Sequence, residues 1–112
     1  MPNPTILIHG RVGTDIETRA VGEGTVSRFR VITNDRVKVG EEWEDRRTSG
    51  WSIETWDKLS AKVGEHLEKG DPVTITGTIY EDAWTDKEGV KKYSTVVRAD
   101  TVGLDVKLAK VK

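Results

Sequence analysis

Four tryptophans are the residues with the most obvious chemical use in this chain, which has only one phenylalanine and two tyrosines beside them. They are Trp43, Trp51, Trp56 and Trp84. One core of this size rarely needs so many indoles, and an indole offers a large, rigid contact surface with little conformational freedom to lose on binding. We therefore expect some of these rings to be exposed for contact with a ligand.

Basic residues lie near the tryptophans in the sequence, where their charge would suit the phosphates of a nucleic acid. The candidates for phosphate contacts are, in order of preference, Arg28, Arg30, Arg36, Lys38, Lys91, Lys92, Arg46 and Arg47. The first four have only Asp35 among them, whereas the last two adjoin Glu44 and Asp45, which partly cancel their field. Aromatic platforms beside a positively charged groove hold single strands, and each stacked base contributes about 1–3 kcal/mol.

Catalytic and metal-binding patterns are weak in this chain. It has no cysteine, and no carboxylate spacing ties its two histidines, His9 and His66, into a metal site. The sequence also lacks a phosphate-cradling glycine loop, a nucleophile elbow and paired carboxylates in an apolar setting. We therefore expect no enzymatic activity, no cofactor and no metal ion.

Length and charge restrict the remaining possibilities. A chain of 112 residues has room for one compact domain, and no apolar run approaches the length of a membrane span. The formal net charge is -1, so a nucleic acid would need positive charge that is locally segregated. The absence of cysteine and of a secretory signal favours a cytoplasmic protein. We expect no membrane partner and no small-molecule substrate, and a protein of this kind that bound nucleic acid would be nucleoid-associated.

Hydrophobic alternation predicts a chain built mainly of strands. They are expected over 5–12, 26–37, 51–56, 73–80 and 92–102. On the second strand, Phe29 and Val31 should share one face and Arg28 and Arg30 the other. The charged residues 35–50 should extend the second and third strands into a hairpin whose tip lies near Gly40, and residues 86–89 should form a turn.

One short helix is predicted between the third and fourth strands. Leu59, Val63 and Leu67 recur every fourth residue, and Gly70 supplies a signal that ends the helix. Three strands, one helix and two further strands match the all-β OB-fold, a five-stranded Greek-key barrel. A ferredoxin-like fold would need two helices, whereas only one periodic segment is visible.

The C-terminal residues extend this domain. Apolar and polar residues alternate from Leu104 to Val111, which could add an extra C-terminal strand at the edge of the sheet. We expect an OB-fold domain over 1–104 and a short extension over 105–112 that forms an edge strand or a clasp.

Five stretches, taken in their order and spacing, resemble the bacterial single-stranded DNA-binding protein family over about residues 5 to 104. They are ILIHGRVG at 6–13, VITN at 31–34, WDKL at 56–59, LEKGDPV at 67–73, and WTDKEG at 84–89 followed by YST at 93–95. The resemblance implies an OB-fold and sequence-tolerant binding of single-stranded DNA in replication, repair or recombination. It also implies a homo-oligomer, usually a homotetramer built from dimers.

The resemblance assigns roles to individual tryptophans. Trp56 matches an aromatic position before the helix, and Trp84 matches the hairpin tryptophan, so both are expected in the DNA groove. Trp51 lies five residues before Trp56, and an odd spacing in a regular strand points two side chains to opposite faces. Either a bulge brings both rings into the groove, or one of the two packs in the core. Trp43 is expected to be an accessory contact at the hairpin tip.

The chain also departs from the family pattern. Val37 stands where many members have a stacking tryptophan, and Asp82 and Ala83 replace a basic pair before Trp84. Both changes should weaken binding, because Val37 offers no aromatic ring for a base and the loss of the basic pair removes phosphate contacts. Members often continue into a long linker and an acidic tip, whereas this chain ends in a basic stretch. We therefore expect either a shortened chain or a tailless paralogue of actinobacterial or phage-like type.

Two other functions fit an OB-fold. A module for protein assembly with weak nucleic-acid binding would bury the tryptophans at subunit interfaces, and the near-neutral charge favours it. An RNA-binding domain of the cold-shock kind would place phenylalanines close together on neighbouring strands, which a single phenylalanine disfavours. An assembly module should have buried indole rings, whereas a single-strand binder should have exposed ones.

Overall fold

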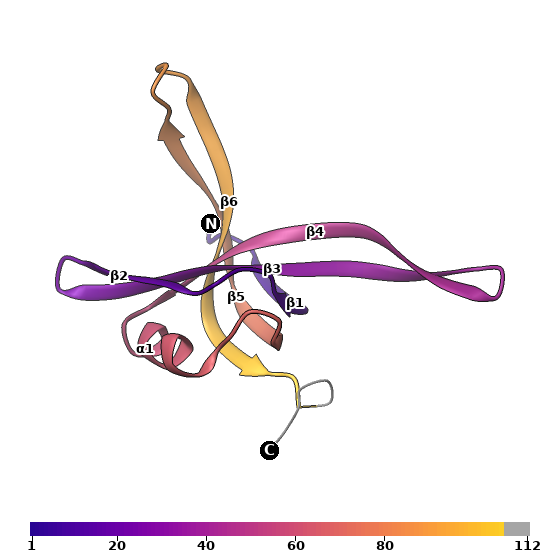
Figure 1. Ribbon diagram of the computed structural model, residues 1–112. Helices are drawn as coiled ribbons and strands as arrows, with labels where there is room; N and C mark the ends of the chain where they lie inside the picture. Colours follow the sequence, from indigo (N-terminus) through magenta and orange to yellow (C-terminus); the bar gives the residue numbers. More distant parts are fainter. Residues whose placement is uncertain (107–112) are drawn as a thin grey trace.

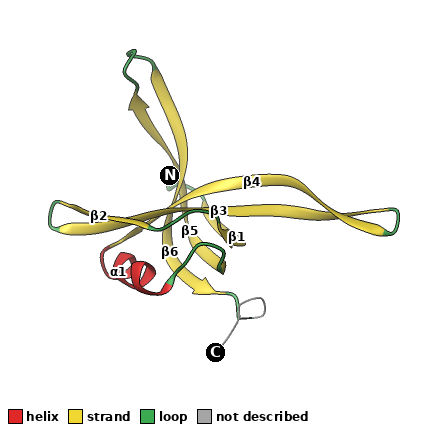
Figure 2. Cartoon of the chain, viewed as in Figure 1, coloured by secondary structure: helices red, strands yellow, loops and turns green. Residues whose placement is uncertain are grey.

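Strands account for most of the chain in the computed structural model, which describes residues 1–106 (Figures 1 and 2). The elements are β1 (Thr5–Val12), β2 (Glu17–Val21), β3 (Gly24–Val39), β4 (Glu42–Trp56), α1 (Asp57–His66), β5 (Pro72–Thr85) and β6 (Lys91–Leu104). The first strand has the bounds that the sequence predicts. The other four predicted strands are longer than predicted, because their polar ends continue the hydrogen-bonded pairing beyond the residues that alternate in hydrophobicity.

Five strands close into a ring in which β1 pairs with β5, β5 with β6, β6 with β4, β4 with β3, and β3 again with β1. All pairs are antiparallel except β4 with β6, where Ser52–Glu54 run parallel to Val96–Arg98. The single helix lies between the third and fourth strands of this ring. The predicted five-stranded Greek-key OB-fold is therefore confirmed.

Two long hairpins extend beyond the ring in different directions (Figure 1). The β3–β4 hairpin turns at Gly40, which has a positive φ of 66°, and the β5–β6 hairpin turns at Gly89, with a φ of 81°. Glycine adopts this left-handed region without the steric cost that a Cβ atom imposes. The tip near Gly40 and the turn at 86–89 are therefore where the sequence places them.

The core lies inside the ring and is filled by aliphatic side chains from every barrel strand. Val31, Ile53, Ile75 and Val97 are fully buried, and Phe29 is nearly so. On β3, Phe29 and Val31 point inward whereas Arg28 and Arg30 are exposed, as the alternation predicts. The outward face of β3 and β4 is thereby left free for polar side chains.

Helix α1 covers one end of the barrel with Val63, and Leu67 follows it as the C-terminal cap. Buried hydroxyl groups hold it in place, since Ser27 Oγ lies 2.6 Å from Ser60 Oγ. The helix ends at His66 and not at Gly70, because Leu67 is already extended. Gly70 instead turns the chain with a φ of 96° and donates its N–H to the carbonyl oxygen of Val12.

Strand β2 was not predicted. All five of its residues are exposed, and it pairs only with β3 among the described strands. Strand β6 runs two residues past the predicted 102, into the segment where an extra strand was allowed. The rest of that expected extension, residues 107–112, lies outside the described residues. Within residues 1–106, no helix is long and apolar enough to cross a membrane.

Gly77 allows β5 and β6 to approach closely at a register shift between Thr76 and Gly77. A Cβ atom there would overlap the carbonyl oxygen of Arg98 and lie 3.0 Å from Ala99 Cα, and both are backbone atoms. We predict that Gly77→Ala lowers the free energy of unfolding by about 1–3 kcal/mol, because the strands must separate to admit the methyl group. Urea unfolding followed by circular dichroism measures this change.

Gly103→Ala is the matched control, since no atom lies within 4 Å of a Cβ at that position of β6. It should leave the unfolding midpoint nearly unchanged. Equal stability of the two variants would contradict the close approach at Gly77.

Candidate nucleic-acid interface

An open cavity of about 640 Å³ lies on the outer face of the barrel, between β3 and β4 on one side and the β5–β6 hairpin on the other. Its polar and aromatic lining residues are Thr14, Asp15, Glu17, Arg28, Phe29, Arg30, Ser52, Glu54, Asp82, Trp84 and Ser94. The cavity thus brings together residues that are up to 82 positions apart in the sequence, from Thr14 to Val96. Its size is typical of a site for a small ligand or part of a larger one.

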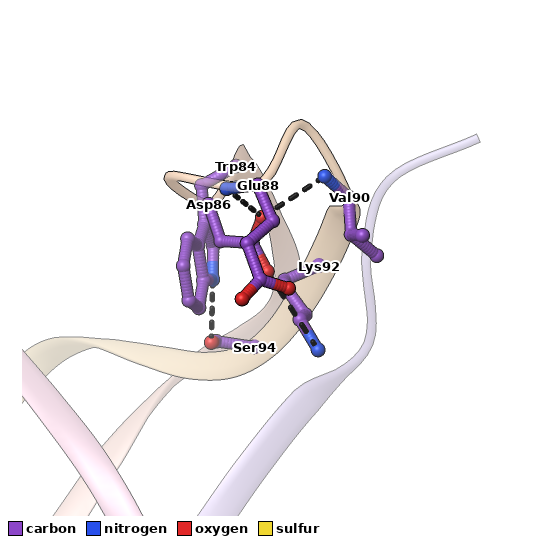
Figure 3. Close-up of polar contacts among 6 residues, drawn as sticks. All are labelled: Trp84, Asp86, Glu88, Val90, Lys92 and Ser94. Carbon is purple, nitrogen blue, oxygen red and sulfur yellow. Dashed lines mark hydrogen bonds and ion pairs between the residues drawn. The ribbon is translucent and has the colours of Figure 1, made fainter.

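Trp84 is the aromatic side chain exposed in this cavity, with 48% of its surface accessible. Its indole N–H donates a hydrogen bond of 3.0 Å to Ser94 Oγ on β6 (Figure 3). The turn beyond it is braced by Asp86, whose Oδ1 accepts hydrogen bonds from the backbone N–H groups of Glu88 and Val90, both at 2.9 Å. The ring is therefore held in one orientation while its face remains accessible.

Trp56 lies on the same side of β4 as Ser52 and Glu54, at the start of α1, but outside the lining of the cavity. It is half-buried, and the guanidinium group of Arg98 lies 5.8 Å from its ring centre. Its Nε1 atom is buried and has no hydrogen-bond partner. A base that stacked on Trp56 would have to share the ring with Arg98.

Trp51 lies on the opposite side of β4 from Trp56. The register between β3 and β4 is continuous from Trp56 to Ser49, so no bulge separates the two tryptophans. Trp51 packs against the core, and its indole N–H donates to Thr33 Oγ1 at 2.9 Å. Of the two arrangements left open by the sequence, the structure has the one in which Trp51 faces the core. Trp43 is exposed near the tip of the β3–β4 hairpin.

The basic residues of β3 all occupy alternate positions of one strand and so share its outer side. Arg28 and Arg30 line the cavity, and Arg36 and Lys38 continue along the β3–β4 hairpin. Arg30 donates to Ser52 Oγ at 2.8 Å and lies over Gly50. These side chains form a line of positive charge that leads from the cavity toward the hairpin tip.

Carboxylates lie beside two of these four β3 cations and beside Lys92 on β6. Arg28 lies 3.7 Å from Glu54, Arg36 lies 3.7 Å from Asp45, and Lys92 lies 4.0 Å from Asp86. The sequence did not reveal these partners, because the paired residues are not adjacent in the chain and come together only through strand pairing. The Arg36–Asp45 pair, which is exposed at both ends, contributes little stability. Each of these carboxylates nevertheless competes with a phosphate for its cation.

The remaining predicted cations are also in contact with other groups. Arg46 pairs with Glu44 at 3.0 Å, and Arg47, which has a positive φ of 52°, pairs with Asp35 at 2.8 Å. Lys92 is opposite Trp84 in the β5–β6 register and shares its side of the hairpin. Lys91 lies on the other side, where its Nζ is 5.7 Å from the centre of the Tyr93 ring.

Glu54 is a site residue that the sequence analysis missed. It is only 5% exposed, and it lines the cavity between Arg28 and Tyr80. The Tyr80 hydroxyl donates a hydrogen bond of 2.6 Å to Glu54 Oε1. Burial, together with this hydrogen bond to a carboxylate, raises the pKa of Tyr80 to about 12. The alternation of Ser52, Glu54 and Trp56 along β4 was the signal that could have identified it.

A family model described as the single-strand binding protein family matches residues 3–105. The chain belongs to this family. It is 30% identical over 108 residues to the single-stranded DNA-binding protein of Corynebacterium glutamicum, which covers 94% of this chain and 48% of that one. It is 29% identical over 101 residues to single-stranded DNA-binding protein 1 of a Nostoc species, covering 88% of this chain and 80% of that one. The chain therefore spans about half the length of the Corynebacterium relative.

A solved structure supports the fold of this family member. The crystal structure of a small single-stranded DNA-binding protein from Streptomyces coelicolor superposes with a TM-score of 0.84 at 24% sequence identity, covering 97% of this chain and all of that one. The family has a DNA-binding function and is not a family of enzymes, which agrees with the expectation that this protein is not an enzyme. Within residues 1–106, no group of three or more potential ligands could hold a metal ion.

We predict that Tyr80→Phe destabilises the protein by about 1–2 kcal/mol at neutral pH, because buried Glu54 loses a hydrogen-bond donor. The raised pKa of Tyr80 means that the folded state holds the phenolic proton more tightly than the unfolded state does. This stabilisation is complete below pH 10, the ordinary value, and is lost as pH rises toward 12. The difference in stability between the wild-type protein and Tyr80→Phe should therefore shrink between these two values, as measured by urea unfolding.

Tyr93→Phe is the matched control, because Tyr93 is exposed on the hairpin. Its stability should follow that of the wild-type protein at every pH. A Tyr80→Phe variant as stable as the wild-type protein at neutral pH would contradict the role of this hydrogen bond.

Proposed function

We propose that this protein binds single-stranded DNA without strict sequence requirements, by stacking bases on exposed tryptophans and attracting phosphates to the basic side of β3. The bases stack on Trp84. They also stack on Trp56 where the guanidinium group of Arg98 moves away from the ring. The phosphates follow Arg28, Arg30, Arg36 and Lys38 along the β3–β4 hairpin. In this way the protein protects single strands during replication, repair or recombination.

The observation that carries this proposal is the position of Trp84. Its ring is half-exposed, fixed by Ser94, and faces a cavity that Arg28 and Arg30 also line. A rigid, accessible indole beside guanidinium groups is the combination that sequence-tolerant single-strand binders use. Duplex DNA should bind poorly to this surface, because paired bases present only their edges and cannot stack on an external ring.

The ion pairs along the hairpins limit the affinity. Five of the eight predicted phosphate contacts have a carboxylate within 4.0 Å. A phosphate must replace this carboxylate or share its cation, so the gain in free energy for each contact is smaller than for a free cation. Asp82 and Glu17 add further negative charge beside the DNA path. We therefore propose a weaker binder than one whose groove carries unpaired cations.

The protein further acts as a homo-oligomer, and a tetramer built from dimers is the form we propose. Strand β1 pairs with β3 only at Arg11 and Val12, so most of one edge of β1 is left without a neighbouring strand among residues 1–106. Leu7 on this strand is 60% exposed. An open strand edge with an exposed apolar side chain is suited to pairing with a second copy.

The test of base stacking compares two exposed aromatic residues of the β5–β6 hairpin. We predict that Trp84→Ala weakens single-stranded DNA binding by about 1–3 kcal/mol, the contribution of one stacked base. Tyr93 is 60% exposed but lies on the opposite side of the hairpin, since it pairs with Ala83. Tyr93→Ala should therefore leave the affinity nearly unchanged when both variants are measured by fluorescence anisotropy with a labelled oligonucleotide.

Two other results would contradict this assignment of Trp84 to the interface. Equal affinities of Trp84→Ala and the wild-type protein would remove Trp84 from the interface. A larger loss for Tyr93→Ala would mean that the DNA binds the other side of the hairpin.

A further inference from the structure

The cavity beside Trp84 is lined by more carboxylates than guanidinium groups. The acidic residues are Asp15, Glu17, Glu54 and Asp82, and the basic ones are Arg28 and Arg30. Carboxylates repel phosphates, so a groove that contacted only the DNA backbone would gain nothing from them. These acceptors instead suit the part of DNA that carries hydrogen-bond donors, which is the edge of a base.

Asp82 is close to the stacking position. It lies two residues before Trp84 on β5 and therefore on the same side of the strand, directly opposite Ser94, whose hydroxyl group holds the indole. Both side chains line the cavity. A base that stacked on the Trp84 ring inside this cavity would lie beside the strand position from which Asp82 lines it.

Glu54 and Arg28 place an acceptor and a donor next to each other in the same cavity. Glu54 Oε1 already accepts a hydrogen bond from Tyr80, which fixes the carboxylate. Its Oε2 lies 3.7 Å from Arg28 Nη2, which is beyond hydrogen-bond distance. The pair therefore retains both an acceptor and donors for a ligand.

Cytosine and thymine differ in how they match these groups. Cytosine presents an amino group, a donor, beside the acceptors N3 and O2, whereas thymine presents two carbonyl oxygens on either side of N3–H. A carboxylate accepts from the cytosine amino group and repels the thymine carbonyl that replaces it. We infer that the cavity beside Trp84 selects bases with an exocyclic amino group, with Asp82 as the specificity-determining residue and Glu54 as a second carboxylate acceptor. The inference rests on the proposed single-strand binding.

The test compares oligo-dC with oligo-dT, which differ in the group at C4, in the proton on N3 and in the C5 methyl group, but not in ring size or in phosphate number. Strands of about 16 nucleotides match the upper range for one OB-fold, and pH 8 keeps oligo-dC unfolded. Fluorescence anisotropy at constant salt should show that the wild-type protein binds oligo-dC about threefold to tenfold more tightly than oligo-dT, the effect of a partly solvated hydrogen bond to a carboxylate.

Asp82→Ala should reduce this preference toward equal binding, mainly because oligo-dT binds more tightly once the repulsion is removed. Asp100→Ala, which removes an exposed carboxylate of β6 outside the cavity, should leave the preference unchanged. If Asp82→Ala instead strengthens both oligonucleotides by the same factor, the carboxylate acts only on the phosphates and the inference is overturned.

Equal binding of oligo-dC and oligo-dT by the wild-type protein also overturns it, while leaving the proposed function in place. Failure of the wild-type protein to bind either oligonucleotide would overturn the proposed function itself.

Discussion

The parallel pairing of Ser52–Glu54 with Val96–Arg98 is the contact on which the rest of this structure depends. It joins the third and fifth strands of the ring and closes the barrel around Ile53 and Val97, which are both fully buried. Closure also brings the outer faces of β3 and β4 next to the β5–β6 hairpin. Without it, the ring would open, and Arg28 on β3 and Trp84 on β5 would be joined only through β1. The cavity between β3, β4 and the β5–β6 hairpin depends on this closure.

Charge compensation shapes the surface around this cavity. The register of β3 with β4 sets Arg28 opposite Glu54 and Arg36 opposite Asp45, so each guanidinium group has a carboxylate partner on the neighbouring strand. The exposed Arg36–Asp45 pair adds little to folding stability. The larger effect of these pairs is on ligands, because they lower the local positive potential and leave carboxylate acceptors beside the stacking ring. We therefore propose that base stacking contributes more to the affinity for a single strand than phosphate attraction does.

Much of the fold could be predicted from the sequence, because strand and helix periods record which side chains are buried. The bounds of β1, the turn near Gly40 and the inward direction of Phe29 all follow from such patterns. Strand β2 could not be found this way, since all of its residues are exposed and it forms only through its ladder with β3. The end of α1 at His66 was likewise decided by local backbone geometry and not by the glycine signal at Gly70.

The candidate site was predictable in part. The exposed position of Trp84 and the shared side of Arg28 and Arg30 follow from motif and alternation. The carboxylate partners of these cations were not predictable, because the register of one strand against the next decides which residues face each other. A shift of that register by one residue would change every pair. The role of Glu54 was hidden for the same reason, since its contact with Tyr80 joins strands on opposite sides of the helix in the sequence.

The most direct measurement is a titration of tryptophan fluorescence with a mixed-sequence single strand and with the same sequence annealed into a duplex, at low and at moderate salt. Stacking on exposed indoles predicts strong quenching by the single strand alone, and quenching that weakens as salt competes for the phosphates. No quenching by the single strand at low salt, or equal quenching by the duplex, would contradict the account of this surface as a single-strand interface.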